Sequence, residues 1–181
     1  MQYVSTRGQA DLQNFSQILL GGLASDGGLF LPQTYPQISD AELTAWRQLP
    51  YASLAFEVLK KFATDIPLAD LQALTAKTYT PQVYCNARAG EDATQITPLS
   101  VLERDGDKTL MLQALSNGPT LAFKDMAMQL LGNLFEYTLA RAVLRRPGLR
   151  NPAQVRHRHA GRRPARHYQK DLHRRRLPQC P

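Results

Sequence analysis

The chain is organised around residues 116–125, which read Ser-Asn-Gly-Pro-Thr-Leu-Ala-Phe-Lys-Asp. This stretch joins a strand-like segment to the strongest helical pattern in the sequence. Residues 117–119 predict a tight bend, because glycine tolerates positive φ and proline fixes its own φ. Thr120 suits the N-cap of the helix that follows. This assignment places Lys124 and Asp125 in the first turn of that helix.

Lys124 is an unusual residue for that position. The amino end of a helix carries partial positive charge, which favours Asp125 and disfavours a neighbouring cation. The same field favours a neutral amine, and only a neutral amine attacks an aldehyde to form a Schiff base. Position alone leaves two interpretations open: a Schiff-base lysine, or an ordinary lysine that extends into solvent, as most lysines do.

The longer motif distinguishes between these interpretations. After Asp125 the sequence continues Met-Ala-Met-Gln-Leu-Leu-Gly-Asn-Leu-Phe-Glu-Tyr over residues 126–137. The whole segment resembles the part of threonine synthases in which Gly-Pro-Thr-x-x-Phe-Lys-Asp carries the lysine that binds pyridoxal 5'-phosphate (PLP). The resemblance implies that Lys124 is this cofactor lysine. Asn117 and Thr120 would either hydrogen-bond the cofactor or build the bend, and Asp125 would either orient the lysine or stabilise the helix start.

A second match lies at the beginning of the chain. Residues 5–8 read Ser-Thr-Arg-Gly, and residues 22–32 read Gly-Leu-Ala-Ser-Asp-Gly-Gly-Leu-Phe-Leu-Pro. Both segments resemble the opening of threonine synthases, and the resemblance as a whole covers residues 1–142, the N-terminal third of the family. It implies a PLP-dependent lyase of threonine biosynthesis, which converts O-phospho-L-homoserine and water to L-threonine and phosphate. Lys124, once released from the cofactor, would be the base of the reaction.

Hydrophobic periodicity and turn signals predict an α/β chain with three parts. Residues 1–90 read as a mostly helical N-terminal domain, with a short strand at 3–8 and helices near 12–23, 40–48, 53–62 and 68–79. Ser39 opens a capping box, Trp46 is the expected core anchor of its helix, and Asp65 is the expected cap before Pro67. Residues 91–142 read as a hairpin, with strands 95–102 and 109–115, and a helix over 126–142. By resemblance they begin an incomplete PLP-binding domain of the tryptophan synthase β type.

Residues 143–181 have a different composition. Residues 1–142 hold ten Lys and Arg against fourteen Asp and Glu, whereas 143–181 hold twelve against one, with all four histidines and five of the twelve prolines. No helix or strand period survives there, so we expect a disordered tail that cannot bury enough surface to fold. Threonine synthases continue at this point with a Ser-Gly-Asp-Thr-Gly-type loop for the cofactor phosphate. We therefore interpret the tail as a frameshifted segment, and we expect this chain to be inactive on its own.

An alternative is a non-enzymatic helical module whose basic tail binds nucleic acid or other anionic partners. We rank it second, because Tyr168 is the single aromatic residue of the tail and base stacking needs several. A third possibility is an unstable product of a degenerate gene. The two cysteines, Cys85 and Cys180, are far apart and form no metal-binding or disulfide pattern. No segment has the length or apolarity of a membrane span or secretory signal, so we expect a cytoplasmic protein with a small-molecule substrate.

Overall fold

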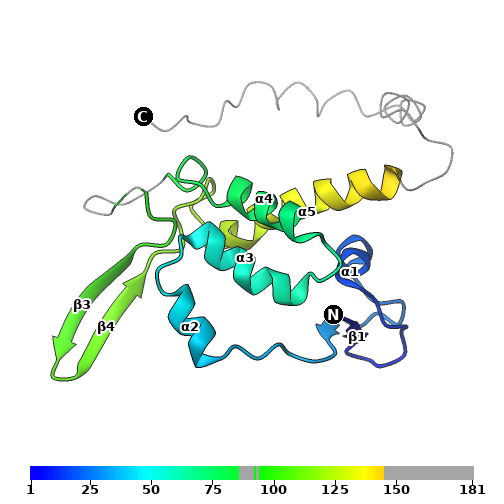
Figure 1. Ribbon diagram of the computed structural model, residues 1–181, viewed down its shortest axis with the longest axis horizontal. Helices are drawn as coiled ribbons and strands as arrows, with labels where there is room; N and C mark the ends of the chain where they lie inside the picture. Colours follow the sequence, from blue (N-terminus) through cyan, green and yellow to red (C-terminus); the bar gives the residue numbers. More distant parts are fainter. Residues whose placement is uncertain (86–91, 93, 145–181) are drawn as a thin grey trace. The chain divides into compact units, whose positions relative to one another are not determined.

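A computed structural model describes residues 1–85, 92 and 94–144 of the chain; the side chains of residues 143 and 144 are not included. The chain divides into two compact units, Met1–Phe135 and Glu136–Pro181. Figure 1 follows the elements along the first unit, from β1 through the helices α1 to α4 and the β3–β4 hairpin to α5. The mixed helix and strand content agrees with the expected α/β class. The expected boundary at residue 90 stays a prediction.

The N-terminal strands pair with each other around a well-anchored turn. Strands β1 (Tyr3–Ser5) and β2 (Phe30–Pro32) are antiparallel. In the turn before β2, the Asp26 carboxylate accepts hydrogen bonds from the Ser5 hydroxyl and from the backbone N–H groups of Gly28 and Gln9. These bonds, led by the one from Gly28, hold the pKa of Asp26 below its usual value. The Asp-Gly-Gly motif therefore has a structural function here.

Four helices lie in this part of the chain, one between β1 and β2 and three after β2, and all four were expected from the sequence. The helix α1 (Phe15–Gly21) is shorter than expected, and Asn14 caps it. The capping box at Ser39 is confirmed, with α2 spanning Asp40–Trp46 and Trp46 buried as expected. Helix α3 (Tyr51–Phe62) packs against α4 (Leu68–Thr78). An ion pair between Lys61 and Glu42 links α3 to α2.

The expected cap of α4 is wrong. Pro67, and not Asp65, occupies its N-cap position, and no side chain caps this helix end. The Asp65 carboxylate instead accepts a hydrogen bond from the backbone N–H of Ser16, 49 residues away, at 3.0 Å. A carboxylate can satisfy any nearby N–H, so packing of α1 beside this loop decided which donor it serves.

The hairpin at Asp105-Gly106 is confirmed. Strands β3 (Leu99–Asp105) and β4 (Lys108–Gln113) are antiparallel, and Gly106 has φ of +56°, which glycine adopts readily. Apolar side chains are exposed on both strands. Such a hairpin offers unpaired backbone groups and apolar surface to any neighbour.

The last described element is α5 (Asp125–Leu144), which crosses the boundary between the two units. It confirms the helix expected over 126–142, and Leu130 and Leu134, one turn apart, are buried. Asn133 of the same helix donates a hydrogen bond to the Thr78 hydroxyl at the end of α4. Among the described helices, none is both long enough and apolar enough to cross a membrane.

Candidate functional site

Lys124 lies directly before α5. Its carbonyl accepts hydrogen bonds from the N–H groups of Ala127 and Met128, at 3.0 and 2.9 Å, so Lys124 is the residue at which the helical bonding begins. Its side chain is exposed. The expectation that Thr120 caps the helix is therefore wrong, because the helix starts at Asp125, four residues later than a cap at Thr120 would require. Asp125 lies in the first turn as expected, whereas Lys124 precedes it.

Thr120 and Asp125 are brought together by the loop that precedes α5. Both the backbone N–H and the hydroxyl of Thr120 donate to the Asp125 carboxylate, at 2.8 and 2.9 Å. The side chain of Asp125 is buried. These two bonds close a six-residue loop that contains Lys124. The Asp125 side chain thus makes structural contacts at the start of the helix, in line with the second of the two roles that the sequence left open for it.

Gly118 allows this loop to close. A Cβ atom at position 118 would lie 2.4 Å from the Asp125 Cβ and 2.6 Å from its Oδ2, so no larger residue fits without displacement. Asn117, beside it, is also buried. Glycine is needed at position 118 for its close approach to Asp125 and not for its backbone freedom, since the φ of Gly118 does not lie in the left-handed region.

Leu121 has an uncommon backbone conformation in the same loop. Its φ is +57°, and it is the single non-glycine residue with positive φ among the described residues. For a bulky side chain such a φ costs on the order of 1–2 kcal/mol. Strain of this kind persists where surrounding contacts over-determine the backbone, and it concentrates at functional sites. The bonds between Thr120 and Asp125 supply such contacts here.

Two tyrosines that the sequence analysis missed also contact the start of α5. The Tyr84 hydroxyl donates to the Asp125 carbonyl, and the Tyr79 hydroxyl donates to the Met126 carbonyl, both at 2.9 Å. Both tyrosine side chains are buried. Tyr79 lies at the end of the helix expected over 68–79, and no local pattern signals a hydroxyl contact with a residue more than 40 positions away.

The first backbone N–H groups of α5 have partners within the chain. Those of Asp125 and Met126 donate to the carbonyls of Ala122 and Phe123, and the next two donate to Lys124. A phosphate group binds at a helix end through N–H groups that have no partner. The exposed amine of Lys124 thus lies directly before α5, whereas the first four N–H groups of the helix are not free to bind a phosphate.

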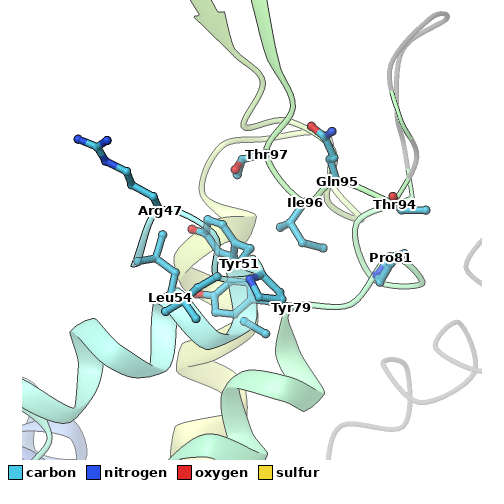
Figure 2. A pocket seen from close by; sticks show the side chains of 12 residues that line it. Arg47, Tyr51, Leu54, Tyr79, Pro81, Thr94, Gln95, Ile96 and Thr97 are labelled. Carbon is cyan, nitrogen blue, oxygen red and sulfur yellow. The ribbon is translucent and has the colours of Figure 1, made fainter. Parts of the chain in front are cut away.

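Two hollows lie in the first unit. One, of about 350 Å³, is lined by the end of β4 and by Leu121, Ala122 and Phe123, next to the lysine loop. The other, of about 720 Å³, lies at the amino end of α3. Figure 2 shows Tyr51 and Tyr79 in its wall, with Ile96 nearby. Lys124 lines neither hollow.

Several expectations fall outside the described residues. These are the basic tail from residue 145 and Cys180 within it. The expectation that the cysteines form no disulfide is wrong for Cys85, which is disulfide-bonded. Neither the frameshift interpretation nor the nucleic-acid alternative is tested by the structure, and both stay predictions.

Comparison with known proteins gives consistent matches. Residues 2–79 match the family model described as threonine synthase N terminus. A threonine synthase from Methylobacillus glycogenes is 59% identical over 140 residues, which are 77% of this chain and 29% of that protein.

Two solved structures agree with these matches. A PLP-bound threonine synthase from Brucella melitensis has a TM-score of 0.65 and 40% identity, and the yeast threonine synthase has 0.67 and 36%. The matches cover 78% and 81% of this chain but only 28% of each of those chains. The chain therefore spans less than a third of the length of the relatives it matches. From the motif around Lys124, the fold and these matches together, we conclude that the chain belongs to the threonine synthase family and corresponds to its N-terminal region.

Proposed function

We propose that this chain supplies the cofactor lysine of a threonine synthase, which converts O-phospho-L-homoserine and water to L-threonine and phosphate. The observation that carries the proposal is the placement of Lys124: an exposed amine directly before a 20-residue helix, in a loop closed by buried Asp125. Family membership supports the same assignment, because one solved relative is described as PLP-bound. The cytoplasmic location expected from the sequence is part of this proposal.

The residues around Lys124 fit covalent attachment. Lys124 would hold the cofactor through its Nζ amine, which is the nucleophile that an aldehyde group requires. When bound, PLP stores the electrons that are freed as bonds to the substrate carbons break. The same Nζ amine would also be placed to hold and return a proton. Thr120 and Asp125 keep the loop closed, and we assign them a positioning role.

The same residues do not fit the phosphate group of the cofactor. The first four N–H groups of α5, those of residues 125–128, are all bonded within the chain. We therefore propose that the phosphate and the substrate are held by the part of the family that this chain does not match, which is more than two thirds of its relatives' length. By this reasoning, the 181 residues alone capture PLP at Lys124 without completing the reaction.

Absorbance spectroscopy with PLP tests this proposal. Purified chain is mixed with PLP, reduced with borohydride, and digested, and the modified lysines are identified by mass spectrometry. We expect an absorbance band that reduction removes and a modification concentrated on Lys124. Lys124→Arg keeps the positive charge but cannot form the bond, so the band should disappear. Lys108→Ala, at an exposed site on β4, is the matched control and should retain it.

Equal modification of Lys124 and Lys108 would contradict the proposal, because it would show only the general reactivity of exposed lysines. A band that survives in Lys124→Arg would do the same. Turnover of O-phospho-L-homoserine by the 181 residues alone would refute the part of the proposal that assigns phosphate binding to other residues.

A further inference from the structure

Three tyrosines form a cluster beneath the start of α5. Tyr79 and Tyr84 stack with their ring centroids 5.9 Å apart, and Tyr51 of α3 meets Tyr79 edge-on at 4.9 Å. Two of the three hydroxyls reach α5: Tyr84 donates to the Asp125 carbonyl and Tyr79 to the Met126 carbonyl. The cluster therefore connects the helical N-terminal segment to the first turn after Lys124.

These hydroxyls are permanent donors. Burial, with a smaller contribution from Tyr51, raises the pKa of Tyr79 to about 12. Burial, followed by the neighbouring Tyr79, raises the pKa of Tyr84 further in the same direction. Both hydroxyls therefore stay protonated near neutral pH and can donate hydrogen bonds. A helical carbonyl oxygen has a second lone pair that can accept such a bond.

The helix does not need these bonds for its own hydrogen bonding. In a regular α-helix the carbonyl of each residue accepts from the N–H four positions later. The tyrosine bonds add a second donor to two successive carbonyls of the first turn. Two fixed donors on neighbouring carbonyls, separated by about 100° around the axis, restrict both translation and rotation of that turn.

We propose that Tyr79 and Tyr84 are positioning residues for Lys124, which hold the first turn of α5 so that the lysine leaves it in one fixed direction. This inference rests on the proposed role of Lys124 as the cofactor lysine. The chain has two independent restraints on the lysine loop: Asp125 closes the loop on Thr120, and the tyrosine pair holds the helix end against the segment after α4.

Tyr3 provides a matched control. Its side chain is also buried, and its hydroxyl also donates to a backbone carbonyl, that of Phe62, at 3.1 Å. Tyr3→Phe therefore removes the same kind of bond far from Lys124 in sequence. If the Tyr84 bond were only one more contribution to stability, the two substitutions would have the same effects.

The experiment compares Tyr79→Phe, Tyr84→Phe and Tyr3→Phe in the full 181-residue chain. The first readout is amide hydrogen exchange at Ala127 and Met128, relative to amides in the middle of α3. The second is the rate of PLP modification at Lys124, relative to Lys108 in the same molecule. Each variant keeps its aromatic ring, and Tyr79→Phe and Tyr84→Phe test the same pair independently.

We expect either tyrosine variant to accelerate exchange at the start of α5 selectively and to change the Lys124-to-Lys108 ratio by about tenfold, since small misplacements of a reacting group have effects of this size or larger. Tyr3→Phe should change neither ratio. Equal exchange effects of Tyr3→Phe and Tyr84→Phe, or unchanged exchange at Ala127 and Met128, would overturn the inference. A wild-type chain without selective Lys124 modification would instead refute the proposed function, and the exchange measurement would still decide whether the tyrosines hold the helix.

Discussion

Substitution of Gly118 by alanine tests how tightly the lysine loop is packed. The added Cβ would lie 2.4 Å from the Cβ of Asp125 and 2.8 Å from its Cγ. These atoms belong to the base of a buried side chain, so they cannot swing away as the end of a flexible chain would. Either the backbone at 118 moves, or Asp125 moves and gives up its hydrogen bonds from Thr120.

The expected cost can be estimated from these two responses. Forcing an extra carbon into a packed site costs about 1–3 kcal/mol. Separating the buried Asp125 carboxylate from its donors costs about 1–3 kcal/mol more. We expect that small movements of the backbone and of Asp125 reduce both costs, and that the free energy of unfolding falls by about 3 kcal/mol in total. With an m-value of about 2 kcal/mol/M, this loss lowers the urea midpoint by about 1.5 M.

Urea unfolding followed by far-UV circular dichroism measures this shift, and Gly132→Ala is the control. Gly132 lies within α5, and a Cβ atom there would meet nothing within 4 Å. Alanine at an open helical position should stabilise by about 1 kcal/mol, so the two identical substitutions should have opposite signs. A loss below about 1 kcal/mol for Gly118→Ala would refute the reasoning, because close packing of this kind costs at least that much.

Three further predictions concern other parts of the chain. The pKa of Asp26 is lowered on folding, so its contribution to stability is present above its unfolded pKa of 3.8 and is lost as the pH falls through the lower folded pKa. In an acid titration followed by circular dichroism, Asp26→Asn should therefore lose less stability than the wild type. Equal losses of stability in the two proteins would contradict this prediction. On the hairpin, the side chains of Leu102 and Leu110 are 58% and 57% exposed. The double variant Leu102→Lys with Leu110→Lys should raise the protein concentration at which light scattering first detects aggregates. An unchanged concentration threshold would show that the hairpin is not the aggregating surface. Resequencing of the gene should reveal a one-base change near codons 141–145 whose correction restores a Ser-Gly-Asp-Thr-Gly-like segment in place of residues 145–181, and a confirmed reading frame without such a segment would exclude a frameshift.

Local chemistry made much of the fold predictable. The capping box at Ser39 acts within four residues, and the Asp105-Gly106 turn acts within a single hairpin, so both were visible in the sequence. The helix over 126–142 was evident from its apolar spacing, and Trp46 was identifiable as a core residue. Asp65 was expected to cap α4, but Pro67 occupies the N-cap position and no side chain caps that helix end, because the Asp65 carboxylate serves the distant Ser16 N–H instead.

Part of the candidate site was also readable from sequence. Lys124 was identified from a motif, and its exposed position before α5 suits the role assigned to it. The need for glycine at 118 was attributed to backbone freedom, whereas the structure attributes it to the close approach of Asp125. Thr120 was assigned to the helix cap, although its two donors serve Asp125 instead. These contacts join residues only a few positions apart, but they form only when the backbone of the loop turns back toward Asp125. Leu121 contributes to this turn by adopting a positive φ.

The sequence by itself therefore determined the elements, the family and the candidate lysine, because each of these depends on patterns within a short stretch. Only the tertiary structure decided which distant groups contact the start of α5 beside that lysine. Tyr84 and Tyr79 reach the start of α5 across separations of 41 and 47 residues. A tyrosine in an apolar stripe has the same local pattern whether its hydroxyl meets solvent or a carbonyl. The partner is set by how helices pack, and a buried hydroxyl takes the acceptor that packing places within reach.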